Sequence, residues 1–328
     1  MSSRDEPNPG RRRRKRQLVS MAVTAIMAAG ALGGLAYAAE GSNGPAMVAS
    51  ASSTITVTDS ASAPASASAP ASARASASVS PSPSLDEQAR SALASAESSL
   101  VSDFSGNVSV AALDLDSGAT ADYGNTASSY DTASIVKVDI LATLLLQTQD
   151  SGGLSSAQKS LATSMIEQSD NDAATTLWNE IGGADGLDTA DKTFGLTGTT
   201  GGSNSDWGLT QTTAADQLTL LQVVFGDNSP LDSASQKYLQ SLMSQVESDQ
   251  AWGVSAAADS GTTSELKNGW LQRSQTGLWD INSIGKVTVD GRTVLIAVVS
   301  DGGSTEAGSI SLVESVASAA AHAITSVG

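Results

Sequence analysis

The pattern of apolar and polar residues divides the chain into three stretches of different character. Residues 18–39 are almost all apolar, whereas residues 40–84 are mainly Ser, Ala, Thr and Pro with few large apolar side chains. Residues 85–328 alternate apolar and polar positions with helical and strand periods. A stretch without large apolar side chains cannot bury a core, so we expect 40–84 to be a disordered linker and 85–328 to be one globular domain.

Within residues 85–328 the periods predict two early strands and three late strands, with a block of helices between the two groups and one further helix at each end. We expect strands at 107–115, 120–123, 264–270, 279–289 and 292–299. We expect helices at 85–101, 135–146, 155–167, 172–181, 213–225, 232–246 and 305–324. This order predicts an α+β fold, with an antiparallel five-stranded sheet flanked by helices and the helical block inserted as a subdomain.

The first 39 residues have the parts of an export signal. Residues 1–17 form a basic n-region with the cluster Arg11 to Arg16, and the apolar stretch ends in Ala36-Tyr37-Ala38-Ala39. This arrangement favours a signal peptide cleaved after Ala38, although about 20 apolar residues are also enough for a retained membrane anchor. Either outcome predicts a protein that is secreted or tethered to the extracellular face of the cytoplasmic membrane.

Composition narrows the chemistry that the domain can perform. The chain has no cysteine, a single histidine (His322) and a formal net charge of −17. The absence of cysteine excludes disulfides and thiolate metal sites, and one histidine leaves little room for a Ser-His-Asp triad or a zinc site. The negative charge argues against nucleic acid as a partner. We therefore expect no metal and no cofactor.

A candidate nucleophile lies at the start of the most apolar helix. Ser134 and Lys137 are three residues apart, so on a helix they share a face, with Thr132 as the expected N-cap. A buried lysine loses its proton easily and could accept the hydroxyl proton of Ser134. The alternative is a lysine that reaches water or pairs with Asp131 or Asp139.

Two further motifs follow in the chain. Ser169-Asp170-Asn171 lies in a polar break between two predicted helices, where a simple helix stop and cap is the alternative interpretation. Lys267-Asn268-Gly269 lies on a late strand before Trp270, where the alternative is an edge-strand lysine beside a bulge glycine. Each motif alone carries little information, and their order along the chain carries more.

In this order the motifs resemble S-x-x-K, S-D-N and K-[TS]-G of the penicillin-recognising serine hydrolases. That superfamily includes the class A β-lactamases and the penicillin-binding D-alanyl-D-alanine peptidases. The resemblance covers roughly residue 85 to the C-terminus and implies the β-lactamase/transpeptidase-like fold. It implies a β-lactam or a peptidoglycan stem peptide as substrate, and we expect a monomer.

The resemblance also implies a role for each matching residue. Ser134 would be the acylated nucleophile, Lys137 its base partner, and Ser169 the group that passes a proton to the leaving nitrogen. Lys267 would bind the substrate carboxylate. Asn171 would hydrogen-bond the side-chain amide of the substrate. Asn268, Gly269 and Trp270 would bind the substrate along the strand. The backbone N–H groups of Ser134 and Trp270 would form the oxyanion hole.

The sequence departs from the family pattern in three places, one of which is the short spacing between Ser134 and Ser169. Class A β-lactamases carry a glutamate on the Ω-loop that activates the deacylating water, whereas here the only glutamate between residues 171 and 212 is Glu180. Asp206 is the one acid in the loop that would carry it, and Asn268 replaces the usual Thr or Ser. We therefore expect a serine hydrolase acylated at Ser134 that cleaves a β-lactam amide or a D-Ala-D-Ala-type peptide. The alternatives are a slowly deacylating penicillin-binding protein or a non-catalytic β-lactam or peptidoglycan sensor, and a purely structural stalked domain would leave the order of the motifs unexplained.

Overall fold

The computed structural model describes residues 83–125 and 128–327. The predicted n-region, signal and nearly all of the linker lie outside the described residues. The first described element, helix α1, spans Leu85–Leu100, and the Ser84 side chain caps it in a capping box with Glu87.

A five-stranded antiparallel sheet forms the centre of the domain, as predicted. Its strands are β1 (Asn107–Asp114), β2 (Thr120–Tyr123), β5 (Glu265–Gln272), β6 (Trp279–Val289) and β7 (Arg292–Asp301). The strands lie in the order β2-β1-β7-β6-β5, so strands from the two ends of the chain meet at β1 and β7. Strand β5, which carries Lys267, Asn268 and Gly269, is therefore an edge strand.

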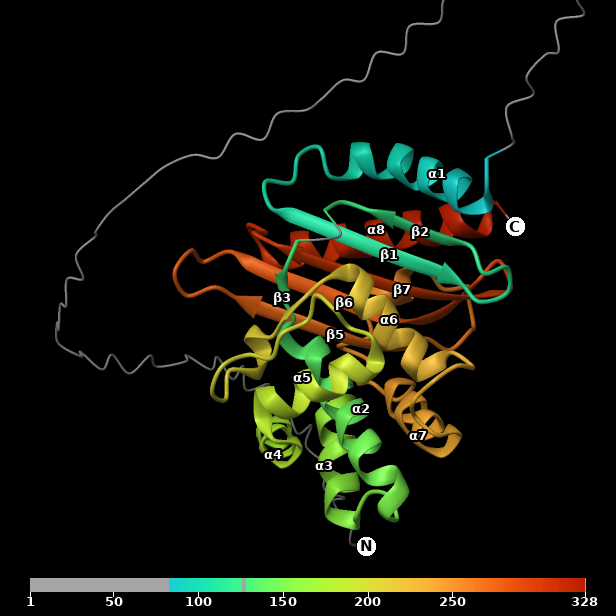
Figure 1. The fold of residues 1–328 in the computed structure, drawn as a ribbon. Coiled ribbons are helices and arrows are strands. Elements are labelled where there is room, and N and C mark those ends of the chain that lie inside the picture. The colour runs from blue at the N-terminus through green and yellow to red at the C-terminus, as the bar shows by residue number, and fades with distance from the viewer. Residues whose placement is uncertain (1–82, 126–127, 328) are drawn as a thin grey trace, which may run out of the picture. The chain divides into compact units, whose positions relative to one another are not determined.

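Helices cover both faces of this sheet (Figure 1). Helices α1 and α8 (Glu306–Thr325) pack together on one face. The inserted helical block lies on the other face and consists of α2 (Val136–Thr148), α3 (Ser156–Glu167), α4 (Asn171–Ile181), α5 (Gly183–Phe194), α6 (Ala214–Phe225) and α7 (Ser233–Met243). Within the described residues, α8 alone is long and apolar enough to cross a membrane, but Val313, Val316 and Ala320 on it are fully buried. Helix α8 is thus a core helix of the sheet domain.

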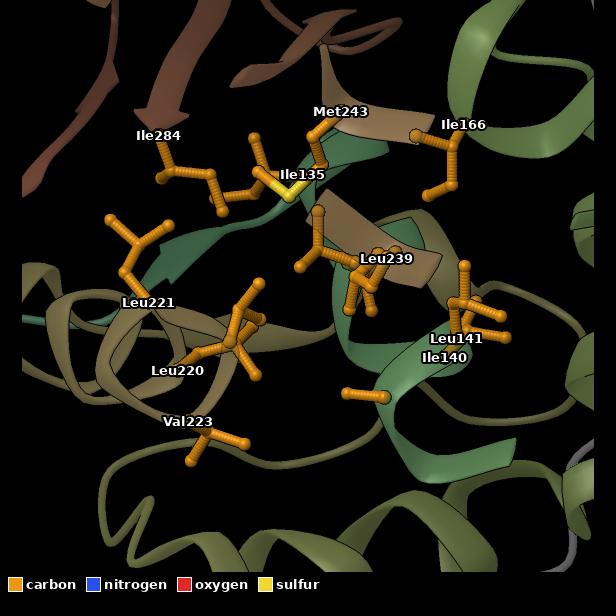
Figure 2. Packing of buried hydrophobic residues seen from close by; sticks show 14 of the residues in the cluster. Ile135, Ile140, Leu141, Ile166, Leu220, Leu221, Val223, Leu239, Met243 and Ile284 are labelled. Carbon is orange, nitrogen blue, oxygen red and sulfur yellow. The ribbon is translucent and has the colours of Figure 1, made fainter. Parts of the chain in front are cut away.

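Helix α2 forms the centre of the helical block. Nearly all of its residues are buried, and its apolar side chains meet residues of α3, α6, α7 and β6. Figure 2 shows this packing around Ile135, Ile140, Leu141, Ile166, Leu220, Leu221, Leu239, Met243 and Ile284. Because the helix is enclosed on all sides, Lys137 in its first turn is also enclosed, with an exposed fraction of 0%.

The structure differs from the sequence prediction at three places. Thr132 does not cap the helix: its side chain makes no cap hydrogen bond, and a 3₁₀ turn (η1, Ala133–Ile135) precedes α2. Helix α5 was not predicted, because its glycines are poor helix formers. It forms through the burial of Leu187 and Phe194, as tertiary packing overrides weak propensity. A two-stranded ladder of β3 (Tyr130–Asp131) and β4 (Gln211–Thr212) was also not expected.

Candidate active site

Ser134 and Lys137 face each other at the junction of the sheet and the helical block. Ser134 lies in the turn η1, and Lys137 lies in the first turn of α2. The Lys137 Nζ is 2.9 Å from the Ser134 Oγ. The three-residue spacing therefore brings the two side chains together as predicted, although Ser134 precedes the helix rather than belonging to it.

The backbone at Ser134 is held in place from the sheet. Asn282 of β6 donates from Nδ2 to the carbonyl oxygens of Asp131 (2.9 Å) and Thr132 (3.0 Å). Gly269 of β5 packs so closely that a Cβ there would lie 2.7 Å from the Ser134 nitrogen. Ala133 has a φ of 46°, a strained conformation for a residue with a Cβ. These contacts fix the position of the Ser134 hydroxyl before a substrate arrives.

The Ser169-Asp170-Asn171 motif supplies the remaining partners of Lys137. Asp170 caps helix α4 by accepting from the Ala173 backbone N–H at 2.7 Å, and Ser169 before it has a φ of 56°. The Lys137 Nζ lies 2.7 Å from the Ser169 carbonyl oxygen, 2.9 Å from the Ser169 Oγ and 2.8 Å from the Asn171 Oδ1. The predicted inter-helix break therefore turns both side chains toward the lysine.

This set of partners suits a neutral lysine. Two of the four oxygens, the Ser169 carbonyl and the Asn171 Oδ1, can only accept hydrogen bonds, and a neutral amine has two N–H groups for them. The nitrogen lone pair is then left for a serine hydroxyl. Burial first, and the nearby charge of Lys267 second, lower the pKa of Lys137 to about 6, while the charge of Asp170 opposes the change. Lys137 is therefore suited to accept the Ser134 proton near neutral pH.

Lys267 on strand β5 is a second buried lysine, and its charge acts on Lys137. It is 0% exposed, and its Nζ donates to the Asn268 carbonyl oxygen at 3.0 Å. Burial lowers the pKa of Lys267 to about 7. A substrate carboxylate would restore its charged form, because an opposite charge nearby favours the protonated amine.

Asn268 and Trp270 make contacts on the other side of the strand. The Asn268 Nδ2 donates to the carbonyl oxygens of Gln250 (2.7 Å) and Trp252 (2.9 Å), so both amide protons are used by this loop. The Trp270 ring packs edge-on against Trp252, with a centroid distance of 6.0 Å. The structure gives the Asn268 side chain a role in holding the loop, and its predicted contact with substrate remains a prediction.

Neither acid suggested by the sequence is paired with Lys137. The Glu180 Oε2 accepts from the Gln158 Nε2 at 3.0 Å, and Asp206 is exposed. Trp207, which follows Asp206, places its ring 4.8 Å from the Lys137 Nζ. Within residues 83–125 and 128–327 no carboxylate forms an ion pair with Lys137.

Sequence reasoning missed two residues of this site. Asn282 was not singled out, although it is fully buried and a buried amide requires hydrogen-bond partners. Trp207 gave no signal, because only the folded loop brings it to Lys137. In the described part of the chain, no group of three His, Asp or Glu side chains is arranged to hold a metal ion.

Comparisons with known proteins identify the sequence family and the fold. The model of the β-lactamase enzyme family matches residues 146–324, which include Ser169, Asn171 and Lys267 but not the Ser134–Lys137 pair. No curated protein sequence matches the chain.

Solved structures share the fold at low sequence identity. A class A β-lactamase from Bacteroides cellulosilyticus is 18% identical with a TM-score of 0.63, and the alignment covers 73% of this chain and 99% of that one. The TLA-1 extended-spectrum β-lactamase is 16% identical with a TM-score of 0.63, over 72% and 99% of the two chains. A point mutant of PBP-A, solved as an acyl-enzyme complex with penicillin G, is 18% identical with a TM-score of 0.62, over 72% and 97%.

Proposed function

Because this chain belongs to the β-lactamase enzyme family, we propose that it is a serine hydrolase acylated at Ser134 by β-lactams or D-Ala-D-Ala-type peptides. The observation that carries the proposal is the position of the Lys137 amine, which lies 2.9 Å from both the Ser134 Oγ and the Ser169 Oγ. One amine in contact with two hydroxyls can take a proton from the first and deliver one through the second.

Acylation would proceed through these contacts. The Ser134 hydroxyl gives its proton to neutral Lys137 as its oxygen attacks the substrate carbonyl. Backbone N–H groups of Ser134 and Trp270 would stabilise the oxyanion, and Lys267 would hold the substrate carboxylate. The Ser169 hydroxyl would protonate the leaving nitrogen and regain a proton from Lys137.

Deacylation has less support than acylation. Asp206 is exposed and Glu180 is bonded to Gln158, while the Trp207 ring lies against Lys137. A water molecule at the acyl group would therefore have to use Lys137 itself as its base. The lack of a carboxylate base for this water among the described residues favours a second candidate function. In it, the protein is a penicillin-binding protein or sensor that keeps its acyl group for a long time.

Intact-mass analysis of the protein mixed with a penicillin, beside a Ser134→Ala control, tests the proposal. We expect an adduct on the native protein and none on the variant. An adduct that disappears while hydrolysed penicillin accumulates identifies a β-lactamase, and a lasting adduct identifies the second candidate. No adduct, or an adduct on Ser134→Ala, would show that the assignment of the nucleophile is wrong.

We also propose that the domain acts outside the cytoplasm, on β-lactams or peptidoglycan stem peptides. The support is the basic and apolar pattern of residues 1–39, which lies outside the described residues. Fractionation of cells that produce the full chain tests this proposal, because recovery in the cytoplasmic fraction would contradict it.

A further inference from the structure

A charged cavity lies beyond the end of strand β5, away from Lys267. It has a volume of about 310 Å³. Its lining includes Tyr130, Asp131, Gln211, Arg273, Asp280 and Asp301. None of these residues has a role in the acylation chemistry described above.

Along strand β5, the cavity and Lys267 lie on opposite sides of Trp270. Arg273 follows Trp270 by three residues, and Lys267 precedes Trp270 by three residues. Three residues of extended strand span about 10 Å. A substrate whose terminal carboxylate is bound at Lys267 and whose carbonyl lies at Trp270 would therefore extend its acyl side chain toward the cavity.

The charges around the cavity do not balance. Three aspartates and one arginine line it, which gives a net charge of −2 when all four are ionised. Arg273 contacts Asp131 and lies 3.6 Å from Asp280, whereas Asp301 accepts from the Asn107 Nδ2 at 2.9 Å. Burial raises the pKa of Asp280 to about 6 even though Arg273 opposes the change. One guanidinium thus leaves part of the negative charge without a cation.

A buried hydroxyl in the same lining independently lacks a hydrogen-bond partner among the described residues. Tyr130 is 2% exposed, and its hydroxyl has no hydrogen-bond partner in residues 83–125 and 128–327. Burial raises the pKa of the Tyr130 phenol to about 12, and the carboxylate of Asp301 contributes to this rise. The phenol oxygen therefore lies in the field of a carboxylate that lines the cavity.

We propose that this cavity binds a primary ammonium group on the acyl side chain of the substrate. An ammonium group has three donors, which match the carboxylates of Asp280 and Asp301 and the phenol oxygen of Tyr130. The enzyme then prefers acyl donors that carry a cation about 10 Å from the scissile carbonyl. The inference rests on the proposed function, since it needs a substrate that acylates Ser134.

Two penicillins with the same nucleus test the inference on the full chain. One carries a 6-aminohexanoyl side chain and the other a hexanoyl side chain, so that they differ only in the terminal ammonium group. The second-order rate constant of acylation is measured for each by intact mass. We expect the aminated penicillin to react about tenfold faster, as a charge-assisted hydrogen bond predicts.

Variants locate the effect. Asp301→Asn retains an acceptor for Asn107 but removes one charge from the cavity, so we expect the rate ratio of the two penicillins to fall severalfold. Asp227→Asn is the matched control, because Asp227 is exposed and its replacement removes the same charge elsewhere on the surface. We expect it to leave the ratio unchanged.

The outcomes separate the two proposals. Equal rates for the two penicillins, or a ratio that Asp301→Asn leaves unchanged, would overturn the ammonium site while the proposed function stands. A ratio that falls equally in Asp227→Asn would also overturn it, because the preference would then follow overall charge. No adduct with either penicillin would overturn the proposed function and the ammonium site together.

Discussion

At the scale of single residues, two buried lysines set opposite limits on the pH range of acylation. Lys137 must be neutral to accept a proton, and burial lowers its pKa to about 6. Lys267 must be charged to attract a carboxylate, and burial lowers its pKa to about 7. We expect the second-order acylation constant to rise up to about pH 6 and to fall above about pH 7.

Initial rates of penicillin adduct formation across the pH range provide the measurement. At saturating penicillin the upper limb should disappear, because the bound carboxylate raises the pKa of Lys267. An acylation constant that keeps rising to the pKa of an ordinary lysine, about 10.4, would contradict the neutral state of Lys137.

The Lys137 side chain can also be removed. In Lys137→Ala the Ser134 hydroxyl loses its base, so we expect acylation to slow by roughly 10²–10⁴-fold. Lys192→Ala is the matched control, because Lys192 is exposed on α5. The same penicillin adduct assay applies to both, and native acylation in Lys137→Ala would exclude the base role.

At the scale of elements, helices α2 and α5 meet through a buried pair of acids. Asp139 and Asp191 are 1% and 2% exposed. Burial raises the pKa of both carboxyl groups, and the pKa of Asp191 reaches about 7. The neighbouring carboxyl of Asp191 also raises the pKa of Asp139. Both groups bind protons more tightly when folded than in the unfolded chain, where the pKa is about 4. Their contribution to stability is therefore fully present below about pH 4 and is lost as the pH rises to about 7 and above.

Replacement of Asp139 by a neutral side chain of the same shape should remove the loss of stability that the buried carboxylates cause at high pH. We expect Asp139→Asn to raise the free energy of unfolding at pH 8 by roughly 2 kcal/mol and to change it little at low pH. Urea unfolding at both pH values measures this, with the exposed Asp150→Asn as control. If Asp139→Asn destabilises the protein equally at both pH values, the two carboxyls do not hold the extra protons.

The turn η3 (Trp207–Leu209) is the element that we expect to limit deacylation. Its Trp207 ring lies 4.8 Å from the Lys137 Nζ, and its indole N–H donates to the Thr175 Oγ1 at 3.1 Å. A glutamate at this position would bring a carboxylate to a water molecule beside the acyl group. We expect Trp207→Glu to speed loss of the penicillin adduct by about tenfold or more. Trp207→Leu is the control, because it loses the same ring and hydrogen bond without adding a carboxylate. If Trp207→Leu loses the penicillin adduct as fast as Trp207→Glu, the effect comes from removal of the ring.

Elements held by local bonds could be predicted from the sequence. Ser155 and Thr213 cap α3 and α6 through their own side chains, and Asp290-Gly291 makes the turn between the predicted strands 279–289 and 292–299, with positive φ at both residues. Distant partners could not be predicted. Asn282, more than a hundred residues away, binds the carbonyl of Thr132. This long-range bond accompanies a turn at Ser134 where the sequence pattern predicted a capped helix.

At the scale of the whole molecule, the site exists only where distant segments meet. The nucleophile comes from η1, the proton relay from the start of α4, and the second lysine from the edge strand β5. The order of the three motifs could be found in the sequence, because each motif is a short local pattern. The orientation of Asn268 could not, since the loop that takes both its amide protons is 16 and 18 residues away in the chain.

The same reasoning predicts where the domain can be shortened. Helix α1 buries Ala89 and Leu93 completely, and its Asp86 Oδ1 accepts from the Thr120 backbone N–H at 2.8 Å. A chain that begins at residue 83 keeps these contacts and the Ser84 cap, so we expect it to acylate at the native rate. A chain that begins at residue 102 lacks the helix and exposes the face of α8 that it covers.

Loss of the Leu93 side chain alone should cost about 2–5 kcal/mol of the free energy of unfolding. Thermal unfolding and penicillin adduct formation on the two shortened chains therefore separate a structural role of α1 from a dispensable one. If the chain beginning at residue 102 is as stable as the chain beginning at residue 83, α1 is not part of the folding unit. If the chain beginning at residue 102 is less stable, the domain begins at Leu85 and helix α1 stabilises it by covering the face of α8.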